Sequence, residues 1–420
     1  MPQRSRTEPS PPTILHLVQP VEGGVARVVI DLVKAQTEEG LRAVVACPSG
    51  GELAPAVESM GVPVHRWQAG RAPGPRLARE VFTAARLIRE LAPDLVHAHS
   101  AKAGLVARLA VRGRIPTVFQ PHAWSFDAVG PTGARLALAW ERHGARWSTR
   151  TLCVSESERR TGQAAGIDTR WTVIHNGIDL KRFNTDHPDN PDNPDRPDSP
   201  DRPYRPDRAD LSDAGEGKRQ LGLKPRDLSG IPADAPLVLC VGRLCRQKGQ
   251  DVLLAAWPRI TAAVPSAHLV LLGDGPERER LTRTAPPHVT FAGASPDVRP
   301  WLHTADLMVL PSRWEGMALA PLEAMACGLP VVVTDVSGAR ESLPPGQETH
   351  GLVPPDDPRA LADAVIALLR DPVLRTALGR QAYGHTRTTR DFRATAAAVS
   401  GLYQDLLNSP HTLTRKSATR

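Results

Sequence analysis

Two glutamates, Glu315 and Glu323, lie eight positions apart in the stretch "SRWEGMALAPLEAMACGLPVVV" (312–333), where no other charged residue separates them. Such a pair could work as a general acid and base. It could also bind a ligand through hydrogen bonds, or consist of a helix cap and a solvated side chain. The sequence alone leaves these three interpretations open.

The surrounding pattern predicts a strand over 306–311 and a helix over 319–327. Glu315 is then expected in the loop between them, and Glu323 about one turn inside the helix. The amides of Met317, Ala318 and Leu319 precede or begin the helix and lack preceding helical partners. They could bind a phosphate or a sugar hydroxyl, and a carboxylate beside them is a suitable acceptor for sugar hydroxyls.

Two cations, Arg243 and Lys248, follow a predicted strand over 236–243 in "VGRLCRQKGQD". In a loop that opens a helix they could hold a diphosphate through charge-assisted contacts. The alternative is a pair of solvated surface cations. The flanking Gly242 and Gly249 favour the anion site, because glycine permits tight turns and close approach of a ligand.

The first half of the chain offers a second set of candidates. Gly23 and Gly24 follow the first strand and open a helix, which suits a phosphate or carboxylate, although a plain turn is an equal alternative. The turn is not G-x-G-x-x-G, and this counts against a nicotinamide enzyme. Three histidines end strands, His97 and His99 in "DLVHAHS" and His122 in "PTVFQPHAW". His122 is the strongest candidate for proton or hydrogen-bond chemistry, because Pro121 ends the strand before it.

Short apolar strands alternate with helical patterns along the chain, which predicts doubly wound α/β domains with parallel sheets. Expected strands in the first half are 13–18, 43–48, 94–100, 116–121, 150–155 and 171–176; those in the second half are 236–243, 267–275, 288–293, 306–312 and 330–335. Four segments follow: a first α/β domain (1–180), a disordered Pro/Asp-rich linker (181–235), a second α/β domain (236–385), and a closing helix with a disordered tail (386–420). The closing helix is predicted from apolar residues between Phe392 and Leu406 at spacings of three and four.

Proline falls at every third position from Pro188 to Pro206, which matches polyproline II. The repeat could be a spacer or a docking ligand, but a tolerated disordered insertion is favoured. The net charge of +7 and pI near 9.4 permit acidic partners without a basic cluster typical of nucleic-acid binding. Five cysteines without a CxxC pair, and an N-terminus without a long apolar run, predict a reduced, cytoplasmic protein with no signal peptide.

Together these motifs resemble the retaining glycosyltransferases of family 4. The matching pieces include "GGVARVV", "HAHS", "PHAWSF", "VSES", "VIHNGIDLKRF", "VGRLCRQKG", "GDGPER" and "SGARE", together with the E-x7-E stretch around Glu315 and Glu323. They occur in family order from about Gly23 to Glu341. The resemblance implies the GT-B fold, in which two Rossmann-like domains face a central cleft.

The resemblance also implies a function. It implies transfer of a hexose-type sugar, with retained anomeric configuration, from a nucleotide diphosphate sugar to a glycan, lipid or small-molecule acceptor, as in cell-envelope or exopolysaccharide synthesis. No metal or cofactor is expected besides the nucleotide sugar. The first domain would bind the acceptor and the second the donor.

Site roles carry over to matching positions of this chain. Arg243 and Lys248 would hold the diphosphate, and Glu315 the sugar hydroxyls beside the amides of Met317, Ala318 and Leu319. Glu323 would bind the ribose. Gly23 and Gly24 would admit the donor phosphate, and His122 would lie near the reacting sugar as a catalytic residue with Glu315.

Two departures from the family pattern stand out. Ala318 occupies a position where the family usually has glycine, so its Cβ could crowd the donor, and the Pro-Asp repeat leaves the hinge length uncertain.

Rival functions also stay open. They are a glycoside hydrolase or phosphorylase using the two glutamates, a sugar-nucleotide epimerase of GT-B shape, and a nucleotide-sugar-binding protein without catalysis.

Peripheral contact with the inner face of a membrane is a further possibility. Arginines gather around a predicted helix over 76–91, and polybasic surfaces attract anionic lipids. They are Arg71, Arg76, Arg79, Arg86 and Arg89. A merely solvated helix face is the favoured alternative.

Overall fold

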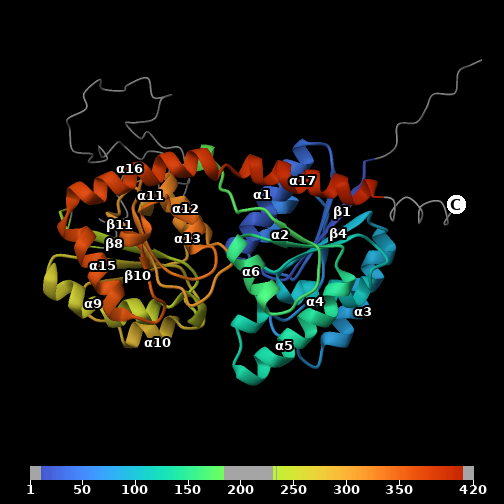
Figure 1. Ribbon diagram of the computed structural model, residues 1–420, viewed down its shortest axis with the longest axis horizontal. Helices are drawn as coiled ribbons and strands as arrows, with labels where there is room; N and C mark the ends of the chain where they lie inside the picture. The colour runs from blue at the N-terminus through green and yellow to red at the C-terminus, as the bar shows by residue number, and fades with distance from the viewer. Residues whose placement is uncertain (1–10, 184–229, 233, 410–420) are drawn as a thin grey trace, which may run out of the picture. The chain divides into compact units, whose positions relative to one another are not determined.

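The structure is a computed structural model that describes residues 11–183, 230–232 and 234–409. These residues form two compact units, residues 11–175 with 393–409 and residues 176–392, which are described separately (Figure 1). The Pro-Asp repeat, most of the predicted linker and the predicted tail beyond residue 409 lie outside the described residues.

Unit 1 is built on a seven-stranded sheet with strand order β3-β2-β1-β4-β5-β6-β7, in which every pair is parallel. The strands are β1 (Thr13–Val18), β2 (Arg42–Cys47), β3 (Val64–Arg66), β4 (Leu95–His99), β5 (Thr117–Gln120), β6 (Arg150–Cys153) and β7 (Trp171–Val173). The order reverses between β1 and β4, and a parallel sheet binds ligands at such a reversal, beyond the carboxyl ends of its strands.

Helices cover both faces of this sheet. They are α1 (Gly24–Glu38), α2 (Leu53–Glu58), α3 (Leu77–Leu91), α4 (Ser100–Val111), α5 (Pro131–Gly144) and α6 (Glu156–Ala164), with 3-10 turns η1 (Ser125–Asp127) and η2 (Ala145–Trp147). Leu15 and Leu17 of β1 pack on α3 and α4, whereas Val18 packs with α1 and α2 on the opposite face. Helix α6 begins at Ser155, whose Oγ accepts a hydrogen bond from the Glu158 amide at 3.0 Å. The VSES motif is therefore a helix cap.

The closing helix α17 (Phe392–Asn408) belongs to unit 1 from Arg393 onward. Its buried side chains include Ala396, Val399, Tyr403 and Leu406, the stripe that the sequence spacing predicts. The Tyr403 hydroxyl hydrogen-bonds the ring of His97 in β4 at 2.5 Å, across 306 residues of chain. Helix α17 therefore contributes to the core over the first sheet.

Unit 2 carries a six-stranded parallel sheet with strand order β10-β9-β8-β11-β12-β13. The strands are β8 (Leu237–Val241), β9 (His268–Leu272), β10 (Val289–Gly293), β11 (Leu307–Leu310), β12 (Val331–Thr334) and β13 (Leu352–Val353). Its order reverses between β8 and β11, which places the loops that follow these two strands beside each other.

The helices of unit 2 include two that pack on each other over the core, α9 (Gln250–Ala263) and α15 (Pro358–Arg370). Asp357 caps α15 by accepting from the amides of Arg359 and Ala360. The remaining helices are α7 (Leu180–Phe183), η3 (Arg246–Lys248), α10 (Arg278–Arg283), α11 (Arg299–Leu302), α12 (Leu319–Ala326), α13 (Ala339–Ser342), α14 (Glu348–Gly351) and α16 (Pro372–Thr389).

The α/β fold class predicted from the sequence is confirmed, and most predicted strands agree with the structure to within two or three residues. Two short edge strands, β3 and β13, were not predicted, because two or three residues carry no readable pattern. The division between the units falls between His175 and Asn176, and unit 2 includes α7 and all of α16. Those boundaries differ from the predicted ones at 180 and 385, since contacts and not composition define a compact unit.

Among the residues that the structure describes, none of the helices combines the length and apolar character needed to span a bilayer. Helix α3 exposes Arg79, Arg86 and Arg89 together with Phe82, a large apolar side chain that is 64% exposed.

One turn in unit 2 depends on glycine. Gly249 ends η3 with φ of 65°, and a Cβ built there would lie 2.0 Å from the carbonyl oxygen of Pro311 at the end of β11. Gly249→Ala should therefore lower the free energy of unfolding by at least about 1–2 kcal/mol, the strain of a left-handed backbone with a Cβ. Urea denaturation checks this value. The matched control is Gly384→Ala, on the exposed face of α16 where a Cβ meets nothing within 4 Å, which should be neutral or stabilising. Equal stability of the two variants would contradict the expectation.

Candidate active site

Glu315 lies in the loop between β11 and α12, where two side chains hold its carboxylate. Lys248 Nζ lies 2.5 Å from Glu315 Oε1, and Ser312 Oγ donates to the same oxygen at 2.8 Å. The side chains of Lys248 and Glu315 are 20% and 10% exposed, so the pair is only partly in contact with water. A charge-assisted contact of this kind is shorter and stronger than a neutral one.

A second set of contacts fixes the loop that carries Glu315. Arg313 forms ion pairs with Asp251 at 2.9 Å and with Asp356 at 2.7 Å, and its amide donates to the carbonyl of Gln247. Burial opposes ionisation of Asp251, but the hydrogen bond and charge of Arg313 outweigh it and lower the pKa of Asp251. Gln247 Nε2 donates to the Trp314 carbonyl at 2.9 Å. The loop before α9 and the loop before α12 are thus joined as one structure.

The start of α12 has free amides close to Glu315. The helix begins after Ala318, which is in extended conformation, and within the described chain no side chain caps its first turn. Asn176 Nδ2 donates to the Met317 carbonyl at 2.8 Å and is buried, so the NGID turn holds the residue before the helix. Ala318 lines a small hollow with Glu315, Ser312 and Thr334. The predicted effect of the Ala318 Cβ on donor binding stays a prediction.

Arg243 follows β8 and has no ion pair within the described residues, in contrast to Lys248. Its carbonyl accepts from Gln250 Nε2 at 3.0 Å, and the next residue, Leu244, hydrogen-bonds Asp274 and Glu277 through its main chain. Close approach requires Gly275 here, because a Cβ would lie 2.3 Å from the Leu244 carbonyl oxygen.

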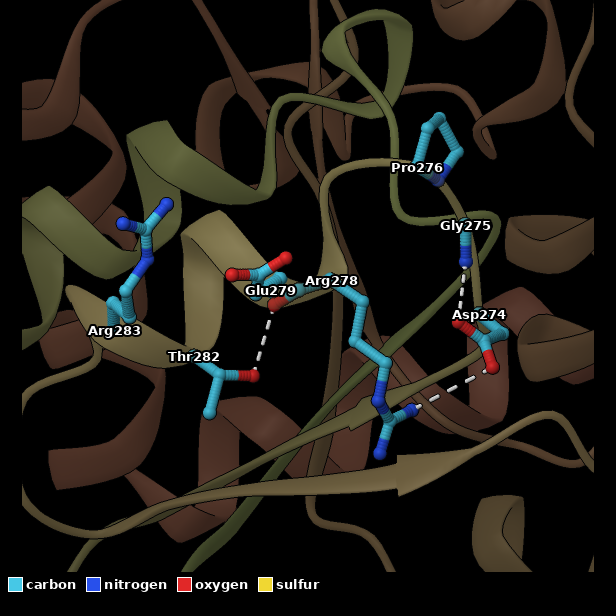
Figure 2. A pocket seen from close by; sticks show the side chains of 7 residues that line it. All are labelled: Asp274, Gly275, Pro276, Arg278, Glu279, Thr282 and Arg283. Carbon is cyan, nitrogen blue, oxygen red and sulfur yellow. Dashed lines mark hydrogen bonds and ion pairs between the residues drawn. The ribbon is translucent and has the colours of Figure 1, made fainter.

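An open hollow adjoins the loop from Asp274 to Glu277, and the sequence analysis assigned it no role (Figure 2). Arg278 and Arg283 line it, with Glu279 between them. The Arg278 guanidinium points back to Asp274, at 3.9 Å. The hollow therefore lies beside the Arg243 loop and carries charges of both signs.

Glu323 lies on α12, half-buried, and does not line the hollow that contains Glu315. The structure thus brings Glu315 together with Lys248 and Ser312, whereas Glu323 is not among the residues that line their hollow. This hollow therefore gives no support to an acid–base pair of the two glutamates.

In unit 1, Gly23 and Gly24 form the turn from β1 into α1. Gly23 has φ of 75° and ψ of −160°, a conformation that suits only glycine, and a Cβ there would meet nothing within 4 Å. Its amide donates to Glu52 Oε1 at 3.0 Å, and both glycines are exposed. The turn is exposed at both glycines, and their role in binding the donor phosphate stays a prediction.

His122 follows β5 and lies against other histidines. Its Nε2 is 3.3 Å from Nδ1 of His99, and its backbone has φ of 59°, unusual for a residue with a Cβ. Burial lowers the pKa of His122 to about 3, and it lowers the pKa of His16 to about 4 despite the hydrogen bond that His16 makes to Gln36 Oε1, which raises it. Burial, with the charges of neighbouring histidines, lowers the pKa of His97 and His99 well below the ordinary value. These rings are therefore neutral at pH 7.

Three residues of these clusters were not predicted as site residues from the sequence. Ser312 and Asn176 hold Glu315 and Met317, and His16 contacts His99. Ser312, three positions before Glu315, could have been noticed as a hydroxyl at a strand end. Asn176 and His16 contact their partners across distant segments, so no local spacing could reveal them.

Comparison with known proteins finds glycosyltransferase families in both halves of the chain. A family model described as "Glycosyltransferase Family 4" matches residues 22–182, and one described as "Glycosyl transferases group 1" matches residues 235–371.

Two curated relatives are similar over much of the chain. The lipopolysaccharide core biosynthesis mannosyltransferase LpsB of Rhizobium meliloti (strain 1021) is 31% identical over 258 residues, 58% of this chain and 63% of that protein, somewhat less than two thirds of its length. A GDP-mannose-dependent monoacylated alpha-(1-6)-phosphatidylinositol monomannoside mannosyltransferase of Corynebacterium glutamicum is 26% identical over 397 residues, 91% of this chain and 94% of that one.

Among solved structures, HepE of Anabaena in complex with UDP-glucose has a similar fold. The TM-score is 0.72 at 24% sequence identity, and the match covers 94% of this chain and all of that one. At this identity the likeness concerns the fold.

The lowered pKa values of His16, His97, His99 and His122 predict how stability depends on pH. Because their pKa values are lowered in the folded state, the unfolded chain binds more protons below about pH 6.5, its ordinary histidine pKa. Stability should therefore be highest above pH 6.5 and fall as the pH drops, by about 1.4 kcal/mol per pH unit for each histidine that is charged only when unfolded.

Urea unfolding at pH 6.5, 6.0 and 5.5 measures this slope. His97→Gln should reduce the slope by about one proton, whereas His350→Gln, at an exposed position of α14, should leave it unchanged. Stability that does not change between pH 6.5 and 5.5 would show that the four rings are not held neutral.

Proposed function

Since the chain belongs to the group 1, family 4 glycosyltransferases, whose two Rossmann-like domains form the GT-B fold, we propose that it is a retaining hexosyltransferase. The donor is a nucleotide diphosphate sugar, and the acceptor is a glycan or lipid-linked molecule in the synthesis of a cell-envelope or extracellular polysaccharide. The observation that carries this proposal is the Glu315 cluster: a carboxylate fixed by Lys248 and Ser312 beside the uncapped start of α12.

Each part of the cluster suits one part of such a donor. The Glu315 carboxylate accepts hydrogen bonds from sugar hydroxyls. The first amides of α12, with the positive end of the helix dipole, suit the neighbouring phosphate. Arg243, which has no ion pair among the described residues, and Lys248 supply the charge that balances a leaving diphosphate. We assign Glu323, about one turn inside α12, to binding the ribose of the donor.

Bond cleavage leaves a positive sugar and a negative diphosphate. Fixed donors aimed at a developing negative charge lower the barrier, and loss of one costs roughly 2.7–4 kcal/mol in well-studied enzymes. We infer that Arg243, Lys248 and the α12 amides take the part a divalent cation plays elsewhere, so that the reaction is independent of metal. His122 of unit 1, neutral at pH 7, acts near the reacting sugar.

Relatives suggest the donor and acceptor classes. The Corynebacterium relative uses GDP-mannose and acts on a phosphatidylinositol mannoside, LpsB acts in lipopolysaccharide core synthesis, and HepE binds UDP-glucose. For this chain we infer a hexose donor carried by GDP or UDP and a membrane-linked acceptor. We infer that the reaction takes place in the cytoplasm, at the inner face of the membrane.

Glu315→Gln tests the proposal. The purified protein is incubated with GDP-mannose, UDP-glucose or ADP-glucose and a lipid-linked glycan, and the product is identified by mass spectrometry. The variant should lose roughly 10- to 100-fold in kcat/KM, because a charged acceptor is replaced by a neutral one of the same shape. The matched control is Asp363→Asn, which removes a surface pair with Arg259 and should retain full activity.

The same assay separates the rival functions. NMR of the product should show the anomeric configuration of the donor, and EDTA should leave the rate unchanged. Release of free sugar without acceptor would indicate a hydrolase, and a changed donor without acceptor an epimerase. Wild-type rates in Glu315→Gln would refute the assigned role of Glu315.

Contact with the membrane is tested through α3. Its exposed Arg79, Arg86 and Arg89 surround the exposed Phe82, and each arginine near an anionic surface contributes about 1 kcal/mol of binding. The protein should sediment with phosphatidylglycerol vesicles at low salt, and replacement of the three arginines by glutamine should abolish this. The control replaces Arg112, Arg359 and Arg380, which are also exposed. Equal sedimentation of both triple variants would exclude α3 as the contact.

A further inference from the structure

One face of the central strands of unit 1 carries histidines where an apolar core is expected. His16 of β1 and His97 and His99 of β4 are fully buried, and His16 and His97 are direct neighbours in the sheet register. The opposite face of the same strands is apolar, with Leu15, Leu17, Val96 and Ala98. Buried polar groups cost stability unless they are hydrogen-bonded, so a histidine cluster in this place requires an explanation.

These rings form a chain of hydrogen bonds that ends at His122. Gln36 of α1 lies 2.8 Å from His16 Nε2, His16 Nδ1 lies 3.0 Å from His99 Nε2, and His99 Nδ1 lies 3.3 Å from His122 Nε2. Successive rings are nearly parallel, at 22° and 25°. The chain connects a buried amide on α1 with the candidate catalytic histidine after β5.

Neutral rings make such a chain directional. A neutral imidazole has one N–H donor and one bare nitrogen acceptor, and burial keeps these rings neutral. Gln36 Oε1 can only accept, so His16 carries its proton on Nε2 and accepts at Nδ1. His99 must then donate from Nε2 and accept at Nδ1, and His122 must donate from Nε2. One amide therefore sets the tautomer of three rings.

The orientation of the Gln36 amide follows from the contact with His16. Its Oε1 lies 2.8 Å from His16 Nε2, and its Nε2 is buried without a hydrogen-bond partner in the described part of the chain. The Tyr403 hydroxyl lies 2.5 Å from His97 Nδ1 and forms a separate branch of the network.

A buried metal ion is the alternative use of this cluster, because His16, His97 and His99 have ring nitrogens within 4.8 Å of one another. However, His16 and His99 use both of their ring nitrogens in the hydrogen-bonded chain. A cation would have to break these contacts, and among the described residues no carboxylate joins these three histidines to balance its charge. The hydrogen-bonded chain gives a partner to both ring nitrogens of His16 and of His99, and we therefore prefer it to a metal site.

We propose that Gln36, His16 and His99 are positioning residues that fix His122 as its Nε2–H tautomer and so present its bare Nδ1 to the substrate. Nδ1 of His122 has no hydrogen-bond partner in the described part of the chain, and it is not one of the buried polar atoms left without one. The unusual backbone of His122 and Ala123, with φ of 59° and 146°, holds the ring in this place.

This proposal rests on the proposed function and makes it more specific. A bare nitrogen accepts a hydrogen bond, so His122 recognises a hydroxyl of the transferred sugar. It would repel the oxygens of a phosphate, which also accept. His122 is therefore assigned to the sugar, and the diphosphate is left to the cations and helix amides of unit 2.

The test is an NMR measurement on the full-length protein labelled with ¹⁵N-histidine. Long-range ¹⁵N–¹H correlations distinguish the two neutral tautomers at pH 7, and His122→Gln identifies the resonances of that ring. Wild-type His122 is expected in the Nε2–H form. Gln36→Met, which removes the acceptor, should give a mixture of tautomers, and Gln36→Glu, which restores an acceptor, should return the Nε2–H form.

Gln120→Met is the matched control. Gln120 of β5 is also a buried glutamine on the sheet and pairs with His99 in the register, but it makes none of the hydrogen bonds that link Gln36, His16, His99 and His122. This variant should leave the His122 tautomer unchanged. In the transfer assay, Gln36→Met should lower kcat/KM by roughly two- to tenfold, the value of one neutral hydrogen bond, and Gln36→Glu should recover it.

The tautomer measurement and the activity assay test separate proposals. A wild-type His122 in the Nδ1–H form, or a pure Nε2–H form that persists in folded Gln36→Met, overturns the proposal that Gln36 sets the His122 tautomer, whatever the activity. The expected tautomers in a protein without transfer activity would support that proposal and refute the proposed function. If Gln36→Met does not fold, the wild-type tautomer alone still decides the direction of the chain.

Discussion

The ion pair between Lys248 and Glu315 is the interaction on which the candidate site of unit 2 depends. It joins the loops after β8 and β11, neighbouring strands whose carboxyl ends meet at the reversal of strand order. Two partly buried charges of opposite sign are costly to separate, because each would lose its partner without gaining full hydration. The pair therefore fixes the carboxylate before any ligand arrives, with Ser312 as its third member.

The ion pair can form only because main chains approach closely around it. Gly249 turns at the Pro311 carbonyl, and Gly338 lies where a Cβ would be 2.1 Å from the Gly316 carbonyl oxygen. Gly273 similarly lies against Gly242. A side chain at any of these positions would separate the loops. The glycines of the sequence motifs are therefore explained by backbone proximity as much as by room for a ligand.

In unit 1, neutral histidine rings are buried against the central sheet, where each needs hydrogen-bond partners. His16 and His99 are satisfied by each other and by Gln36 and His122. A hydrogen-bonded network of this kind is expensive when incomplete and specific when complete. Tyr403 of α17 joins the network through its hydrogen bond to His97. A helix late in the sequence thus contributes to the polar interior of unit 1.

The sequence by itself determined the α/β class and most strands and helices, because parallel strands and the helices between them are local patterns. It also predicted Arg243, Lys248, Glu315 and His122 as site residues from strand-end motifs, and these stay predictions. It did not reveal β3 or β13, whose few residues carry no period. Only the tertiary structure decided that Lys248 pairs with Glu315 and that His16 and Gln36 connect through His99 to His122. These relations join segments far apart in the chain, and which side chains meet there depends on strand order and register.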